Sequence, residues 1–386
     1  RRKDDNIVGI ARAGYFPGDM EISLSYSRRD YLNLYWPAEK LAEYDESQSI
    51  TDLAKLDFRS GELPFGRIEA SATAQYHDIC GNHLPDLYLK EYSGRLALEY
   101  LPDAGFSALA GATANLSDER EPEFSPFASL SIPFGGTLLL SAGGALVSEF
   151  PTPLELYYDE SFSPDSGDSM APDFVIRRGD PNLEPEEILR GWGGLTHQQG
   201  DGLTLSLSGY YTGSDNLISW TEHLDAGTLT VTPEPSKYET WGFRAGFEYS
   251  PDQDFLMGAE YQLTKKLSGD YPRGRYDDFY APPGSRFLIY AEEEREYMNG
   301  DLRGRLRLEG EGFLGIPDGE GGELPDCALA RCHLNLNFLT FDAFAGLEYA
   351  FVRSGDGWGN GEYRLVPGYN LPKSSWRAGI SWYFLD

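Results

Sequence analysis

The sequence has little cysteine, methionine or histidine: its 386 residues include 3 Cys, 4 Met and 5 His. It has no run of about eighteen apolar residues, which argues against transmembrane helices. Catalytic and phosphate-binding motifs such as Gly-x-Ser-x-Gly and His-Glu-x-x-His are absent. Acidic residues outnumber basic ones by 62 to 32, for a net charge of −30, which argues against binding to nucleic acid.

The three cysteines suggest at most one disulfide between nearby residues and one metal site. Cys327 and Cys332 are separated by four residues and could form a disulfide if the segment between them turns instead of extending. Cys80 lies between His77 and His83 in a His-x-x-Cys-x-x-His spacing that could hold a metal ion, but no fourth ligand is evident nearby. We expect no metal and no other cofactor.

Enzymatic activity also has little support. Hydrolytic enzymes commonly place histidine beside serine or an acid, and His77, His83 and His223 are the candidates for such a role. Acidic segments such as 159–168 lack the ligand spacing of a calcium site and are interpreted as loop surface. We expect that the chain is not an enzyme and has no catalytic residue.

The sequence is rich in glycine and aromatic residues, with 44 Gly, 25 Tyr and 21 Phe. This composition favours strands, turns and aromatic girdles. At the end of the chain, Trp376, Ala378, Ile380 and Trp382 alternate with polar residues and glycine. Alternation with a period of two is typical of a strand with one apolar and one polar face. A final strand of this kind, with aromatic residues at its apolar positions, is typical of an outer-membrane β-barrel.

The same alternation recurs through most of the chain, in segments long enough for a tilted strand to cross a bilayer. A soluble β-sandwich has the same period, but the strands are too many and too long for one sandwich, and their connections alternate between short and long. We therefore predict an all-β transmembrane antiparallel β-barrel of about 16–18 strands, with short periplasmic turns and long extracellular loops. The expected strands are 5–16, 20–36, 51–62, 66–78, 88–101, 105–117, 122–133, 136–148, 187–198, 203–220, 236–250, 254–267, 283–297, 300–313, 327–338, 341–353 and 373–384. The expected long loops are 37–50, 79–87, 149–187, 267–283, 314–327 and 354–373.

Two stretches resemble the barrel of TonB-dependent receptors. The first is Asp180-Pro-Asn-Leu-Glu-Pro-Glu186, followed by a strand and then by Gly209-Tyr-Tyr and Asn216-Leu-Ile-Ser-Trp220. The second is Tyr363-Arg-Leu-Val-Pro-Gly368, which leads into Gly379-Ile-Ser-Trp-Tyr-Phe384. The resemblance implies a barrel in the outer membrane of a Gram-negative cell that mediates the passage of a substrate.

Members of that family also carry a plug domain and a segment that engages TonB, and no plug-like stretch precedes the first expected strand. We expect residues 1–386 to form one outer-membrane β-barrel domain, with no plug domain in this chain. The expected partners are outer-membrane lipid and lipopolysaccharide, with a plug domain or partner protein in the lumen or at the rim. Two alternatives stay open: a plugless porin or scaffold barrel that sheathes or anchors a partner, and a surface-binding or assembly protein anchored by its barrel.

The best candidates for lumen-lining residues are Arg303, Arg305, Arg307 and Glu309, which share one face of segment 300–313. Neighbouring guanidinium groups repel one another unless carboxylates face them. Glu292 and Glu294 on the preceding strand are placed to do so. The row is interpreted either as an anion-attracting stripe in a pore or as a charge ladder that fixes the packing of the lumen or holds a plug.

Aromatic residues in the expected outer loops are candidates for binding a ligand or partner. The loop 149–187 is unusually long, and loops of that length are usually either functional or disordered. Aromatic residues are also expected in membrane girdles, so they do not decide the function. The outer-loop candidates are Tyr157, Tyr158, Phe162, Phe174 and Trp358.

Overall fold

The chain is almost entirely β-strand. The computed structural model describes residues 2–35, 45–100, 105–118, 120–163, 172–200, 202–269, 282–317, 322–338, 341–354, 357–360, 363–366 and 369–382. Its main element is one sheet of 20 strands. Within these residues the helical elements are α1 (Pro153–Tyr157) and the 3-10 turn η1 (Met298–Gly300). No described helix is long and apolar enough to cross a lipid bilayer.

Seventeen long strands form the wall of the sheet, and each overlaps one of the expected segments. The predicted all-β fold with about 16–18 antiparallel strands is therefore confirmed. The wall strands are β1 (Arg2–Tyr15), β2 (Glu21–Tyr35), β3 (Asp45–Arg59), β4 (Arg67–Gly81), β5 (Leu84–Tyr100), β6 (Ser107–Ser117), β7 (Arg120–Phe134), β8 (Leu138–Glu149), β11 (Glu186–Gln199), β12 (Leu203–Asp225), β13 (Thr228–Tyr249), β14 (Phe255–Gly269), β15 (Ser285–Tyr297), β16 (Leu302–Leu314), β19 (Cys327–Phe338), β20 (Phe341–Ser354) and β24 (Ser374–Trp382).

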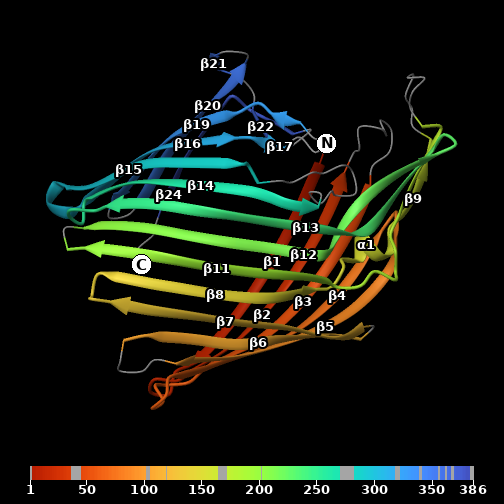
Figure 1. Cartoon of the computed structure of the whole chain (residues 1–386), viewed down its shortest axis with the longest axis horizontal. Helices are drawn as coiled ribbons and strands as arrows, with labels where there is room; N and C mark the ends of the chain where they lie inside the picture. Colours follow the sequence, from red (N-terminus) through yellow and green to blue (C-terminus); the bar gives the residue numbers. More distant parts are fainter. Residues whose placement is uncertain are drawn as a thin grey trace.

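The short elements lie in the connections between wall strands. They are β9 (Asp159–Phe162), β10 (Phe174–Arg178), β17 (Ile316–Pro317), β18 (Glu323–Leu324), β21 (Gly357–Asn360), β22 (Tyr363–Val366) and β23 (Tyr369–Leu371). We call the end of the wall that carries them the loop end and the opposite end the turn end. Figure 1 shows α1 and β9 at the loop end, on the right.

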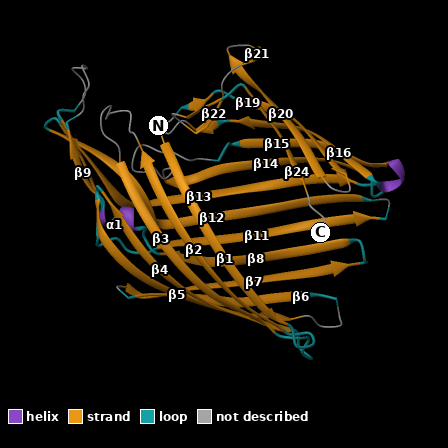
Figure 2. Cartoon of the chain, turned by 180° about the vertical axis from the view of Figure 1, so that it is seen from behind, coloured by secondary structure: helices purple, strands orange, loops and turns teal. Residues whose placement is uncertain are grey.

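Consecutive wall strands pair antiparallel, and β8 pairs with β11 across the connection that carries α1, β9 and β10. Figures 1 and 2 view the molecule from opposite sides and show that the sheet curls round, so that β1–β3 cross strands β8–β13 on the other side of the molecule. Within the described residues no pairing joins β1 to β24.

Alternation gives the wall two chemically different faces. One row across it contains Leu205, Phe247, Ala259 and Ile289, which are cross-strand partners in β12–β15. This apolar face is exposed: the exposed fraction is 56% for Ile289 and 81% for Trp376 on β24. On the opposite face, the adjacent row carries Thr204, Glu248, Gly258 and Tyr290. Exposed apolar surface on this scale indicates contact with a membrane or another protein.

The long loop expected at 79–87 was wrong, and the strands expected at 203–220 and 236–250 are longer than predicted. Residues 79–87 are not a long loop, because β4 and β5 continue to a tight turn at Asn82 and His83. The hairpin β12–β13 likewise extends to a tight turn at Ala226 and Gly227. In both hairpins the strands stay paired past the point where apolar and polar residues stop alternating, because pairing satisfies the backbone N–H and C=O groups whatever the side chains are.

The hypothesis of a disulfide between Cys327 and Cys332 was also wrong. Both cysteines lie in the uninterrupted strand β19, and both are free. Five steps along an extended strand place their Cα atoms about 16 Å apart and their side chains on opposite faces. A disulfide requires Cα atoms within about 7 Å of each other.

Gly66 is required by the turn between β3 and β4. Its φ is +133°, and a Cβ atom there would lie 1.8 Å from the carbonyl oxygen of Glu99. We predict that Gly66→Ala lowers the free energy of unfolding by roughly 3 kcal/mol or more, through backbone strain and a steric clash. The matched control is Gly135→Ala, because φ is +58° but a Cβ atom would meet nothing within 4 Å. Urea unfolding in detergent micelles tests this, and equal losses for both variants would contradict it.

Candidate functional site

A ladder of ion pairs crosses the polar face of strands β15, β16, β19 and β20. The arginines predicted as lumen-lining lie here, and the predicted carboxylates face them. Arg303 Nε lies 3.2 Å from Glu294 Oε1, and Arg305 contacts both Glu292 (2.9 Å) and Glu294 (3.4 Å). The cross-strand register explains these contacts, because β15 and β16 pair residue by residue along this stretch.

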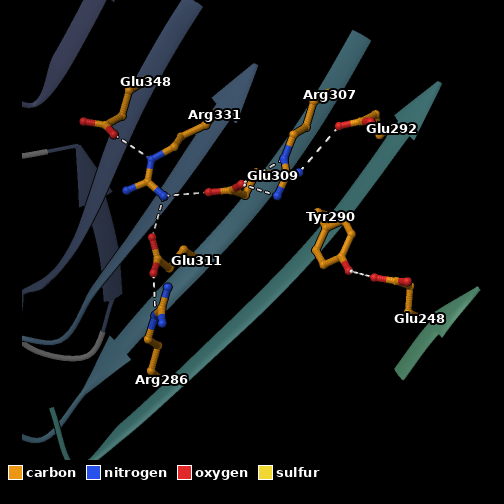
Figure 3. A network of polar contacts seen from close by, with 9 residues as sticks. All are labelled: Glu248, Arg286, Tyr290, Glu292, Arg307, Glu309, Glu311, Arg331 and Glu348. Atoms are coloured by element: carbon orange, nitrogen blue, oxygen red, sulfur yellow. Dashed lines mark hydrogen bonds and ion pairs between the residues drawn. The ribbon is translucent and has the colours of Figure 1, made fainter. Parts of the chain in front are cut away.

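The ladder continues toward the loop end through Arg307, Glu309 and Arg331. Arg307 Nη2 lies 3.1 Å from Glu309 Oε2, and Arg331 Nη1 lies 2.7 Å from Glu309 Oε1. Arg331 also contacts Glu311 and Glu348, and Glu311 contacts Arg286 at 2.6 Å. Figure 3 shows this half of the ladder, with Arg331 surrounded by three carboxylates.

The ladder is electrically almost balanced and partly buried. It contains five guanidinium groups (Arg286, Arg303, Arg305, Arg307, Arg331) and six carboxylates (Glu292, Glu294, Glu296, Glu309, Glu311, Glu348). The exposed fraction of the side chain falls from 54% at Arg303 to 6% at Glu311. Since every arginine is paired with carboxylates, the geometry favours the charge-ladder interpretation over a stripe that attracts anions.

Two cavities adjoin polar parts of the wall. One, of about 750 Å³, lies near the turn end and is lined by residues that include Asp301, Arg303, Arg305 and Asn337. The other, of about 610 Å³, lies near the loop end. Residues lining the second cavity include Arg120, Glu123, Tyr157, Asn182 and Asn216.

At the loop end, the connection between β8 and β11 folds against two hairpins. Its helix α1 begins with a capping box, in which Thr152 and Glu155 bond each other's backbone N–H groups. Strand β10 pairs with β9 and runs parallel to β13 at residues 174–177. The backbone N–H of Asp159 donates to the carbonyl of His83, in the β4–β5 turn, at 2.9 Å. The connection therefore joins the β4–β5 and β12–β13 hairpins.

A group of side chains holds this assembly together, and we call it the rim cluster: the buried Tyr158, Glu160, Arg177 and Trp220 and the half-buried His83. The Glu160 carboxylate is fully buried and accepts from Tyr158 Oη (3.0 Å) and Arg177 Nη1 (3.4 Å), with His83 Nε2 at 3.6 Å from its other oxygen. The Tyr158 ring packs edge-on against Trp220, with centroids 6.4 Å apart. Aromatic packing and a compensated charge together fix the connection on the rim.

The segment from Asp180 to Glu186 connects this assembly to β12. Asp180 Oδ1 accepts the backbone N–H of Asn182 (2.8 Å), which forms a local turn. The register of β12 shifts between Ser214 and Leu217, and Glu186 Oε1 accepts the N–H of Ile218 (2.6 Å) beside this irregularity.

The predicted outer-loop aromatics have different environments. Tyr158 is only 1% exposed and belongs to the rim cluster, whereas Tyr157 is half-buried and lines the loop-end cavity. Phe174 is 39% exposed at the start of β10. The backbones of Phe162 and Trp358 lie in β9 and β21, but their side chains fall outside the described residues.

The histidines have separate partners. His77 contacts Thr51, Gln75 and Glu91, His83 contacts Glu160, and His223 Nε2 lies 2.8 Å from Glu234 Oε1. Among the described residues, no group of three or more His, Cys, Asp and Glu side chains is arranged to hold a metal ion. Sequence reasoning missed Glu160 and Arg177, because neither lies in an alternating segment or a recognisable motif.

Comparisons with known proteins give a fold but no close relative. No protein-family model matches the chain, and no curated protein does. Solved structures do match. The siderophore receptor PirA from Acinetobacter baumannii is 10% identical with a TM-score of 0.68, and the match covers 99% of this chain and 63% of that one. The fold is that of the wall of TonB-dependent receptors.

Two further structures agree. The siderophore receptor PirA from Pseudomonas aeruginosa is 12% identical with a TM-score of 0.65, covering 99% of this chain and 65% of that one. The copper transporter OprC is 13% identical with a TM-score of 0.61, covering 99% of this chain and 66% of that one. The chain thus spans less than two thirds of the length of the two siderophore receptors.

Replacing an arginine of the ladder should cost the most stability where the ladder is most buried. We predict that Arg331→Met lowers the free energy of unfolding by about 3 kcal/mol. The substitution removes the guanidinium that pairs with three carboxylates, Glu309, Glu311 and Glu348, and Glu311 is buried. Arg303→Met is the control, and it should cost less than about 1 kcal/mol because its ion pairs are exposed. Urea unfolding of the two variants, followed by tryptophan fluorescence, tests the difference; an equal cost would show that burial does not matter here.

The role of the rim cluster can be tested at Arg177, with the neighbouring exposed Arg178 as the control. Arg177→Met should destabilise β9 and β10 locally by about 3 kcal/mol, since Glu160 is buried. Arg178→Met should change little, because both Arg178 and its partner Asp159 are more than 60% exposed. Hydrogen exchange of residues 159–162 and 174–178 measures the effect. Unchanged exchange in Arg177→Met would refute the role of the cluster.

Proposed function

We propose that this chain forms a β-barrel wall in the outer membrane of a Gram-negative cell and mediates the passage of a substrate across it. One observation carries the proposal: a continuous hydrogen-bonded sheet exposes large apolar side chains on one face and lines the other with polar and charged groups. The likeness to outer-membrane receptor structures supports it.

The physical reason lies in the backbone. Hydrocarbon cannot satisfy peptide N–H and C=O groups, so a membrane-spanning sheet must bond them between its own strands. The wall strands do this over 9 to 23 residues each. That is about the length, or more, that a tilted strand needs to cross a bilayer.

The ion-pair ladder bears on what the polar face of the wall contacts. A paired, nearly neutral polar wall suits contact with a plug or another folded protein better than it suits anion selection. It also favours a second candidate, a scaffold barrel that sheathes a partner. In the uptake interpretation residues 1–386 act as a single barrel domain, and siderophores and copper, named for the similar structures, define the first substrates to test.

Labelling of single cysteines tests membrane orientation. With Cys80, Cys327 and Cys332 replaced by serine, Asp225→Cys places a thiol at the loop end and Asp252→Cys places one at the turn end. In intact cells we expect a membrane-impermeant maleimide to label only Asp225→Cys, whereas permeabilised cells should allow labelling of both. Equal labelling of both sites in intact cells would contradict the proposed orientation, and recovery of the protein in the soluble fraction would contradict the membrane location.

A further inference from the structure

The cavity of about 750 Å³ near the turn end lies on the polar face of strands β16, β19 and β20. Six of its lining residues form two adjacent rows of cross-strand partners, Arg303–Asn337–Asp342 and Arg305–Asn335–Phe344. They alternate with the exposed Leu306, Leu334 and Leu347 of the apolar face, so all six side chains belong to the polar face. The two rows form a grid about 10 Å wide, because two inter-strand spacings separate β16 from β20.

Phe344 gives this cavity a flat apolar floor. Its partner on β24 is Gly379, and a Cβ atom at Gly379 would lie 2.6 Å from Phe344 Cε1, so the ring lies against the glycine backbone. Phe344 is 42% exposed, and its other ring face is therefore open to the cavity. A ring held in this way can pack against the apolar C–H face of a sugar.

Amide groups lie beside the ring. Asn337 Nδ2 donates to Asp342 Oδ1 at 2.7 Å, which orients both side chains. Asn335 lies opposite Phe344, is exposed, and has no hydrogen bond from its amide to any described side chain. Because an amide carries both donors and an acceptor, Asn335 and Asn337 can each bond a hydroxyl group in either role.

The charges of the cavity are already compensated. Its lining contains two guanidinium groups, Arg303 and Arg305, and three carboxylates, Glu294, Asp301 and Asp342. Each guanidinium contacts two carboxylates of the ladder. This balance favours a polar but uncharged ligand over an anion.

The backbone groups of the wall are paired as well. Across the cavity, β16, β19, β20 and β24 hydrogen-bond to one another residue by residue. An extended peptide therefore finds no free strand edge to join. A ligand here is held by side chains alone, with amides and a carboxylate around an aromatic ring.

We propose that this cavity binds a neutral oligosaccharide, with one sugar ring packed on Phe344 and hydroxyl groups bonded to Asn335, Asn337 and Asp342. The inference rests on the proposed function and names its substrate class, since the cavity lies on the polar lining that a substrate would pass. The grid is wider than one sugar ring, which favours an oligosaccharide over a single sugar. The cavity volume falls within the range of about 300–1,000 Å³ that is typical of small-molecule sites.

Saturation-transfer NMR on the full chain in lauryldimethylamine oxide micelles tests the assignment, because this detergent contains no sugar. The probes are maltotriose, cellotriose and mannotriose, and titration of each gives its Kd. We expect at least one trisaccharide to bind and Phe344→Ala to weaken its binding about tenfold, equivalent to about 1.4 kcal/mol.

The matched control is Phe127→Ala, which should leave the Kd unchanged. Phe127 also lies on the polar face over a glycine, since a Cβ atom at Gly111 would lie 2.6 Å from Phe127 Cζ. Its cross-strand partners are Gly111 and Ala145, so it has no amide opposite it.

Asn335→Ala keeps the test decisive if Phe344→Ala does not fold, because Asn335 is exposed. It should weaken binding about fivefold through the loss of a hydrogen bond. A Kd that neither variant changes would overturn the site, and failure of all three trisaccharides to bind would overturn the saccharide class. Binding of triglycine with the same loss in both variants would assign the cavity to peptides and overturn the proposal.

Failure of this inference is distinguishable from failure of the proposed function. Maleimide labelling of Asp225→Cys and Asp252→Cys reports orientation in the membrane and does not depend on the cavity. The expected labelling without saccharide binding would remove only the substrate class. Recovery of the protein in the soluble fraction would remove passage across the membrane, whatever the cavity binds.

Discussion

The structure depends on one constraint: along most of their length the wall strands keep apolar side chains on one face and polar side chains on the other while neighbouring strands stay hydrogen-bonded. A change of register by one residue would exchange the two faces. The rows that run through Leu205 and Ile289, and through Thr204 and Tyr290, show that the pattern stays in phase from β12 to β15. Two different surroundings, one apolar and one aqueous, are what such a sheet requires.

The ion-pair ladder and the rim cluster have different structural roles in this wall. The ladder brings charges to the polar face and neutralises them locally, so that the wall carries many ions without a strong field. The rim cluster instead uses the fully buried Glu160, with Arg177 and Tyr158, to fix a long connection across two hairpins. One assembly stiffens the wall, and the other gives the loop end a defined shape.

The sequence was sufficient for features that repeat with a period of two. It predicted every wall strand and the pairing of Arg303 and Arg305 with Glu294, because cross-strand neighbours follow from alternation and register. It could not predict the rim cluster, whose residues meet only through tertiary folding of an irregular segment. Tyr158 illustrates the difference: the sequence shows a loop aromatic available to a ligand, and the structure shows a buried ring that packs on Trp220.

The most direct test of the two-faced wall is the accessibility of spin labels along β12 in reconstituted membranes. Labels would be placed singly at residues 203 to 208 and probed with oxygen, which concentrates in hydrocarbon, and with a water-soluble nickel complex. The account predicts high oxygen accessibility at Leu203, Leu205 and Leu207 and high nickel accessibility at Thr204, Ser206 and Ser208. Accessibility without this period of two, or nickel accessibility at the leucines, would contradict it.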